Sequence, residues 1–126
     1  MVTRILIIED EEDIRDFAAR VLELEGFRVL QAVNGGEGLR MLRQYPVSLV
    51  LLDLRLPDYD GWTLLEKLKS DPQLSMVPVV MFTASAAVSR RSQALAVGAV
   101  DYLVKPLSAA RLKETVHSIL TPERGI

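Results

Sequence analysis

Five polar or charged residues of this chain follow directly after short apolar runs. Glu9 and Asp10 follow RILII, Asp53 follows VLL, Thr83 follows VVMF and Lys105 follows YLV. A short run that is apolar on every residue is typical of a strand buried on both faces of a parallel sheet. Ligands of such sheets bind beyond the carboxyl ends of the strands, so we expect the five side chains to meet in one crevice.

The types of these side chains indicate phosphoryl chemistry. Three carboxylates in one crevice repel one another unless a cation lies among them, and Mg²⁺ suits a site made of a few carboxylates and waters. An ammonium from Lys105 and a hydroxyl from Thr83 would then bind the oxygens of an incoming phosphoryl group. Asp53 is the candidate nucleophile, because carboxylates can form aspartyl phosphates.

Each residue alone also has an ordinary structural explanation. Asp53 could form a turn or cap the next helix, Thr83 could cap a helix, and Lys105 could be a solvated surface lysine. The acidic residues 11–13 are best explained as a helix start favoured by the helix dipole. The functional interpretation rests on matching chemistry at the ends of several strands.

Strands and helices are predicted to alternate five times. Apolar runs predict strands at 4–8, 27–33, 47–52, 79–82 and 99–104. Helical spacing predicts helices from about Ile14 to the stop at Gly26, at 37–45, 62–70 and 88–97, and after the cap at Ser108. This alternation predicts an α/β fold, a flavodoxin-like doubly wound five-stranded parallel sheet of order 2-1-3-4-5 with helices on both faces.

Individual helix positions carry narrower expectations. Phe17 belongs to the apolar stripe of the first helix, and Leu95 is the clearest core residue of the fourth. Gly38 should weaken the second helix by about 1 kcal/mol relative to Ala. Trp62 is expected to cover the start of the third helix and not to bind a ligand.

Composition limits the class of protein. The chain has 126 residues, 49% hydrophobic and 25% charged, as expected of one compact domain. It has no cysteine, which excludes disulfides and thiolate metal sites. Its net charge of −2 gives no reason to expect direct nucleic-acid binding, and no apolar stretch approaches a membrane span. A cytoplasmic location is therefore the default expectation.

Four segments resemble the receiver domain of two-component response regulators. They are ILIIEDE at the first strand, LVLLDLRLPDYDGW at the third, VVMFTAS at the fourth and GAVDYLVKP at the fifth. The resemblance covers nearly all of the chain. It implies a receiver domain over residues 1–120, with 121–126 as a C-terminal tail or the start of a linker.

The resemblance also implies roles for the site residues. Asp53 would accept a phosphoryl group from a phosphohistidine on a sensor histidine kinase or a histidine phosphotransfer protein. Such a domain is a signalling module, not an enzyme with a separate substrate. Mg²⁺ would be bound by Asp10, Asp53 and the backbone carbonyl of Arg55, and by Glu9 through a bound water. The phosphoryl group would be contacted by Thr83 and Lys105. The Lys105-Pro106 peptide bond would be cis.

A conformational switch is implied as well. Thr83 would move toward the phosphoryl group while Tyr102 turns inward, which changes the surface of the fourth helix, fifth strand and last helix. That surface would signal to a downstream effector domain or protein. Residues 55 and 85 would tune the lifetime of the phosphoryl group, and kinase specificity is expected around residues 14–17.

The expected oligomeric state is a monomer or a weak dimer. Regulators that dimerise through the switch surface usually carry a network of acidic and basic residues there. Here Arg91 and Asp101 remain, but Ala96, Val97 and Val100 leave that network incomplete.

Three other interpretations stay open. A phosphatase of the haloacid dehalogenase type would need a second Asp at the position of Arg55. A flavin-binding module would need a phosphate loop where acidic residues 9–13 stand. A degenerate receiver would bind partners without phosphorylation, which the intact set of Asp10, Asp53, Thr83 and Lys105 argues against.

Overall fold

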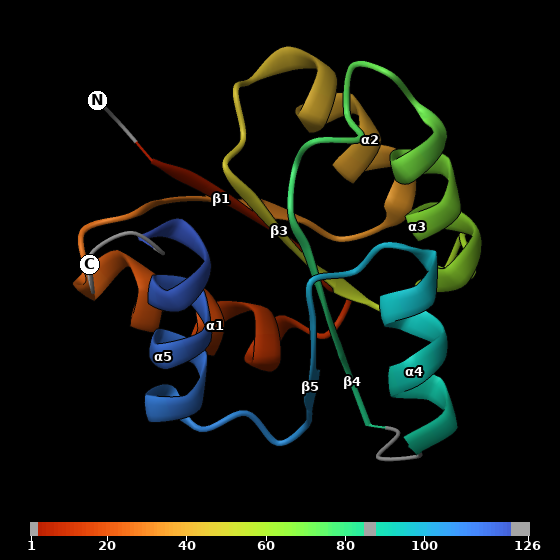
Figure 1. Ribbon diagram of the computed structural model, residues 1–126. Coiled ribbons are helices and arrows are strands. Elements are labelled where there is room, and N and C mark those ends of the chain that lie inside the picture. Colours follow the sequence, from red (N-terminus) through yellow and green to blue (C-terminus); the bar gives the residue numbers. More distant parts are fainter. Residues whose placement is uncertain (1–2, 85–87, 122–126) are drawn as a thin grey trace.

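The chain folds as five strands that alternate with five helices (Figure 1). The computed structural model describes residues 3–84 and 88–121. The strands are β1 Arg4–Ile8, β2 Arg28–Ala32, β3 Leu49–Asp53, β4 Val79–Thr83 and β5 Asp101–Val104. The helices are α1 Glu12–Leu24, α2 Gly35–Gln44, α3 Gly61–Ser70, α4 Val88–Val97 and α5 Ala109–Leu120.

All five strands are parallel and lie in the order β2-β1-β3-β4-β5. This confirms the predicted doubly wound flavodoxin-like sheet. The register pairs Ile8 with Leu52, and therefore brings Glu9 level with Asp53. It also pairs Thr83 with Val104, the residue before Lys105. The register thus delivers the predicted site residues to one edge of the sheet.

Helices cover the sheet in two layers, with α1 and α5 on one face and α2, α3 and α4 on the other (Figure 1). Side chains alternate between these faces along each strand, so Ile5 and Ile7 pack in one cluster and Leu6 and Ile8 in the other. Residues 49–53 of β3 are buried throughout. A strand buried on both faces is the reason for the continuous apolar run in the sequence.

Side-chain caps explain where several helices begin. The Asn34 side chain accepts a hydrogen bond from the Glu37 amide, so α2 begins at Gly35, two residues before the predicted start. Asp60 caps α3 in the same way, and Ser108 caps α5 as predicted. Strands β2 and β5 are shorter than predicted, whereas β4 extends to Thr83.

Two predictions about apolar helix positions are wrong. Leu95 is 41% exposed, and the neighbouring Ala94 is the fully buried residue of α4. Phe17 is 42% exposed, while Ala18 and Leu22 carry the buried stripe of α1. In both helices small residues lie closest to the sheet, because a short side chain lets the helix approach it.

Gly38 has a packing role that its low helix propensity conceals. A Cβ atom at this position would lie 2.5 Å from Cδ1 of Ile8, which is fully buried in β1. The glycine therefore lets α2 lie close to the strand that carries Glu9 and Asp10. Over residues 3–84 and 88–121, no helix has both the length and the apolar content to cross a bilayer.

Candidate functional site

Three carboxylates meet at the carboxyl edge of β1 and β3. One oxygen from each of Glu9, Asp10 and Asp53 lies within 4.8 Å of the others. Glu9 is fully buried and Asp53 is 2% exposed, whereas Asp10 faces solvent. The sequence predicted this cluster, and the parallel register produces it.

Lys105 supplies the positive charge of the site. Its Nζ atom lies 2.5 Å from Oε1 of Glu9 and 3.2 Å from Oδ2 of Asp53. The same atom lies 3.8 Å from Oε1 of Glu11 and 5.1 Å from the centre of the Phe82 ring. The lysine side chain is only 11% exposed, so its charge acts on the carboxylates with little screening by solvent.

Burial and charge shift the proton affinities of this pair. Burial raises the pKa of Glu9 to about 7, and the nearby Asp53 charge adds to this increase. Hydrogen bonds from Lys105 and the Glu11 amide oppose it but do not cancel it. Burial works to lower the pKa of Lys105, yet the hydrogen bond to Glu9 and the charge of Asp53 outweigh burial and raise it. Lys105 therefore stays cationic.

Arg15 holds the segment that carries Glu9 and Asp10. From α1, its guanidinium donates to the backbone carbonyl of Glu9 at 3.0 Å and lies 3.5 Å from that of Asp10. A further hydrogen bond to the Gln31 side chain at 3.2 Å fixes the guanidinium against β2. The sequence analysis missed this residue, because an arginine on a helix has no pattern that distinguishes it from a solvated one.

Asp58 anchors the loop that follows Asp53. Its two carboxylate oxygens accept hydrogen bonds from the amides of Gly35 and Gly36, at 2.8 and 2.9 Å, at the start of α2. Slight burial works to raise the pKa of Asp58, but these amide donors lower it overall. Within the same loop the Arg55 amide donates to Oδ1 of Asp53 at 3.3 Å. This anchor was also missed by the sequence analysis.

Most of the predicted site residues share a cavity of about 310 Å³, although Glu9 is not among its lining residues. Thr83 is 3% exposed and lies on its wall. The peptide bond between Lys105 and Pro106 is cis, as the resemblance implied. The lining residues are Asp10, Glu11, Asp53, Arg55, Thr83, Ala84 and Lys105.

Tyr102 lies apart from this cavity. Its side chain is 3% exposed and belongs to the core cluster beneath α4, together with Ala94. Its backbone carbonyl accepts a hydrogen bond from Arg91 at 3.1 Å. Ser85, the other residue expected to tune the site, falls outside the described residues.

The donor set fits a hard divalent cation. Mg²⁺ prefers carboxylate, carbonyl and water oxygens, and the three clustered carboxylates offer such ligands at a solvent-accessible edge. Lys105 balances only part of their negative charge. A divalent cation at this edge would therefore lower the electrostatic cost of holding the carboxylates together.

Charged side chains cross the face formed by α4, β5 and α5. Asp101 lies 3.5 Å from the guanidinium of Arg91 on α4 and 3.9 Å from that of Arg111 on α5. Val100 and Val104 lie beside this pairing and are exposed. Both arginines thus pair within the same chain.

Known proteins resemble the whole chain. The family model of the response regulator receiver domain matches residues 5–117. The DNA-binding dual master transcriptional regulator RpaA of Synechocystis sp. is 38% identical over 93% of this chain and 48% of its own length. A probable cyclic di-GMP phosphodiesterase of Vibrio cholerae is 34% identical over 96% of this chain and 27% of its own length.

A solved receiver structure agrees with these relatives. The CheY-like response regulator receiver domain protein from Methanospirillum hungatei JF-1 has a TM-score of 0.88 at 32% identity, covering 99% of this chain and 98% of that one. The chain spans about half or less of the length of the curated relatives named above. With its sheet order and its match over residues 5–117, this chain belongs to the response regulator receiver domain family.

Proposed function

We propose that this chain is the phosphoacceptor module of a two-component phosphorelay. Asp53 takes a phosphoryl group from a phosphohistidine on a sensor histidine kinase or a histidine phosphotransfer protein. The observation that carries the proposal is the buried Asp53 carboxylate, held 3.2 Å from Lys105 in a cavity that also contains Thr83 and two further carboxylates.

The transfer exchanges one bond to phosphorus for another. A carboxylate oxygen of Asp53 forms the new bond to phosphorus as the bond between phosphorus and the imidazole nitrogen breaks. The bonding electrons leave with the imidazole, whose other ring nitrogen carries a proton, so the products are an aspartyl phosphate and a neutral histidine. Lys105 offsets the charge on the phosphoryl oxygens, and the Thr83 hydroxyl donates a hydrogen bond to one of them.

Mg²⁺ is the proposed cofactor. Asp10, Asp53 and the backbone carbonyl of Arg55 would hold it, with Glu9 acting through a bound water. The ion would offset negative charge on the phosphoryl group during transfer. Asp58 and Arg15 support this proposal because they fix the two loops that carry these ligands.

The proposed output is a change in the α4–β5–α5 surface. Thr83 moves toward the phosphoryl group, and Tyr102 occupies the inward position that it already has in this structure. The surface then contacts a downstream effector domain or protein. We further propose that the protein is cytoplasmic, is a monomer or weak dimer, and does not bind nucleic acid itself. Residues 1–120 would form the receiver, and residues 121–126 would form a tail or linker.

The other interpretations fit the structure less well. A haloacid dehalogenase would need a carboxylic acid at the position of Arg55. A flavin phosphate at this edge would meet the carboxylates of Glu9, Asp10 and Asp53. A degenerate receiver would not need the contact between Lys105 and Asp53.

Acetyl phosphate tests the proposal directly. We expect the protein to gain the mass of one phosphoryl group when it is incubated with acetyl phosphate and MgCl₂, as measured by intact mass spectrometry. Asp53→Asn should gain none, while Asp16→Asn, an exposed carboxylate on α1, should behave as the parent. Equal labelling of the Asp53→Asn variant would place the acceptor elsewhere.

A further inference from the structure

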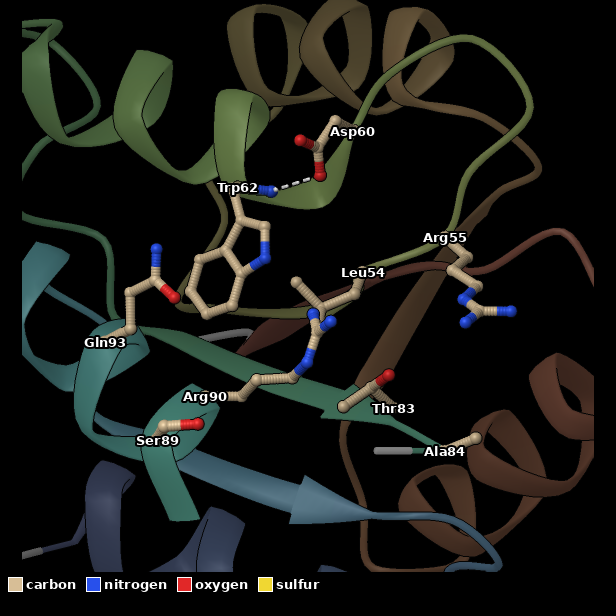
Figure 2. A pocket seen from close by; sticks show the side chains of 9 residues that line it. All are labelled: Leu54, Arg55, Asp60, Trp62, Thr83, Ala84, Ser89, Arg90 and Gln93. Carbon is tan, nitrogen blue, oxygen red and sulfur yellow. Dashed lines mark hydrogen bonds between the residues drawn. The ribbon is translucent and has the colours of Figure 1, made fainter. Parts of the chain in front are cut away.

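A second and larger cavity lies beside the acceptor cavity. Its volume is about 730 Å³, within the range of small-molecule sites, and it lies over the first turns of α3 and α4 (Figure 2). Thr83, Arg55 and Ala84 border both cavities. The remaining lining residues are Leu54, Asp60, Trp62, Ser89, Arg90 and Gln93.

Two guanidinium groups border this second cavity. Arg90 extends across it toward Trp62 and Leu54, whereas Arg55 stands at the opposite rim (Figure 2). Neither guanidinium has an ion pair or hydrogen bond with another side chain among residues 3–84 and 88–121. Asp60 is the one carboxylate among the described lining residues, and it caps α3 through the Trp62 amide at 3.1 Å. The cavity therefore carries an excess of positive charge.

Trp62 provides a flat aromatic wall. Part of the indole packs on the core, and the rest faces the cavity (Figure 2). Leu54 adds an apolar surface below it, while Ser89 and Gln93 offer polar groups from α4. An aromatic ring with the Arg90 guanidinium beside it is suited to a ligand that has a planar ring and an anion (Figure 2).

We propose that this cavity binds a planar heteroaromatic monophosphate, of the chemical class of a nucleoside monophosphate. The ring stacks on the Trp62 indole, and the phosphate accepts hydrogen bonds from Arg90, whose guanidinium lies beside that ring (Figure 2). A guanidinium can bind a phosphate through two parallel hydrogen bonds, and stacking on an aromatic side chain tolerates different bases.

The proposed ligand needs neither the acceptor nor the metal. Asp53, Asp10 and Lys105 line the smaller cavity and not this one. Binding should therefore persist in EDTA and in the Asp53→Asn variant. This separates the inference from the proposed phosphoacceptor function, because either can fail while the other holds.

Trp62 is the only tryptophan of the chain, so its fluorescence reports on this cavity alone. We expect AMP, titrated in EDTA, to change Trp62 emission saturably, with the same Kd by isothermal titration calorimetry. Adenosine lacks the anion and inorganic phosphate lacks the ring, so each should bind at least about tenfold more weakly than AMP.

Arginine variants identify the anion site. Arg90→Gln should weaken AMP binding at least about tenfold, since it removes a charge-assisted hydrogen bond, whereas Arg55→Gln, at the opposite rim, should weaken it less. Arg40→Gln, an exposed arginine on α2, is the matched control and should bind as the parent does. Three results would overturn the proposal: no saturable response to AMP, equal affinity for adenosine or phosphate, or parental affinity in the Arg90→Gln variant.

Discussion

The two sides of the acceptor cavity are held in different ways. On the side of β1, the Glu9 carboxylate contacts Lys105 and the Glu11 amide, and Arg15 binds the Glu9 carbonyl. On the side of β4, the backbone carbonyl of Thr83 accepts the Lys105 amide at 2.8 Å, but its hydroxyl has no hydrogen bond among the described residues. We call these the acidic side and the hydroxyl side.

This difference assigns separate tasks to the two sides. The groups of the acidic side are held in place by hydrogen bonds, so they need little reorganisation when a cation binds. The hydroxyl side keeps an uncommitted donor, which can form a new hydrogen bond without first breaking one. The acidic side should therefore dominate stability and charge balance, and the hydroxyl side should dominate the response to the phosphoryl group.

Replacing Lys105 should have the largest effect. Lys105→Met leaves Glu9 and Asp53 without their cation, which should lower the free energy of unfolding by about 3 kcal/mol in EDTA. Phosphorylation by acetyl phosphate should slow by about 100-fold. Urea unfolding and timed mass spectrometry measure the two effects.

Thr83→Val is the matched change on the hydroxyl side. It keeps the volume of the side chain and removes the hydroxyl, so stability should change by less than about 1 kcal/mol. Added Mg²⁺ should restore part of the free energy of unfolding that Lys105→Met loses. It should change the free energy of unfolding of Thr83→Val little. A similar loss of stability in both variants would contradict the division into two sides.

The pKa of Glu9 predicts how stability varies with pH on the acidic side. In the folded protein burial raises it to about 7 from an ordinary 4.5, so the folded state binds a proton that the unfolded state has released. In EDTA the free energy of unfolding should therefore fall by about 3 kcal/mol as the pH rises from about 4.5 through 7. Urea midpoints across this range measure it.

Glu9→Gln is the control, because it removes the titrating group and keeps the side-chain shape. Its stability should be nearly flat over the same range. Asp58, Asp71 and Lys105 do not interfere, since Asp58 and Asp71 have pKa values lowered from 3.8 and Lys105 has one raised from 10.5. The other shifted group is Lys69, whose pKa burial lowers from 10.5. A parent protein that becomes more stable between these pH values would show that Glu9 is ionised throughout.

Sequence patterns predicted the parts of this structure that depend on periodicity. The sheet order and the helix layers follow from the alternation of strands and helices, and the meeting of Asp53 with Lys105 follows from apolar strands that end in polar residues. Such patterns are strongest for the central strands β1, β3 and β4, which are buried along nearly their whole length, whereas the edge strand β2 has exposed residues. The roles of Thr83 and Tyr102 stay predictions.

The sequence was less informative where a contact joins distant residues. Asp58 binds the amides of Gly35 and Gly36, over a separation of more than twenty positions, and nothing in the local sequence marks it. The prediction that Leu95 is the core residue of α4 was wrong for a related reason. Hydrophobicity alone ranked Leu95 above Ala94, whereas close approach of α4 to the sheet favours the smaller residue.

Gly38→Ala should have a small effect on stability. Alanine gains about 1 kcal/mol of helix propensity, but its Cβ would meet Cδ1 of the buried Ile8 at 2.5 Å. Overpacking in a core costs about 1–3 kcal/mol, so a net loss of about 1 kcal/mol is expected in urea unfolding. The displaced strand carries Glu9, so Lys105 should also lose part of its contact with the acidic side.

The double variant with Ile8→Val tests this account, because it removes the Cδ1 atom that the new methyl group would meet. In the Ile8→Val background, Gly38→Ala should cost less stability than in the parent, since the contact with Cδ1 is gone and only the one with Cγ1, at 2.9 Å, still opposes the gain in helix propensity. An equal loss of stability in both backgrounds would show that the cost comes from the backbone of α2 and not from Ile8. The strand that holds Glu9 would then tolerate a larger residue on α2, and the tight packing would not be needed to place the acidic side.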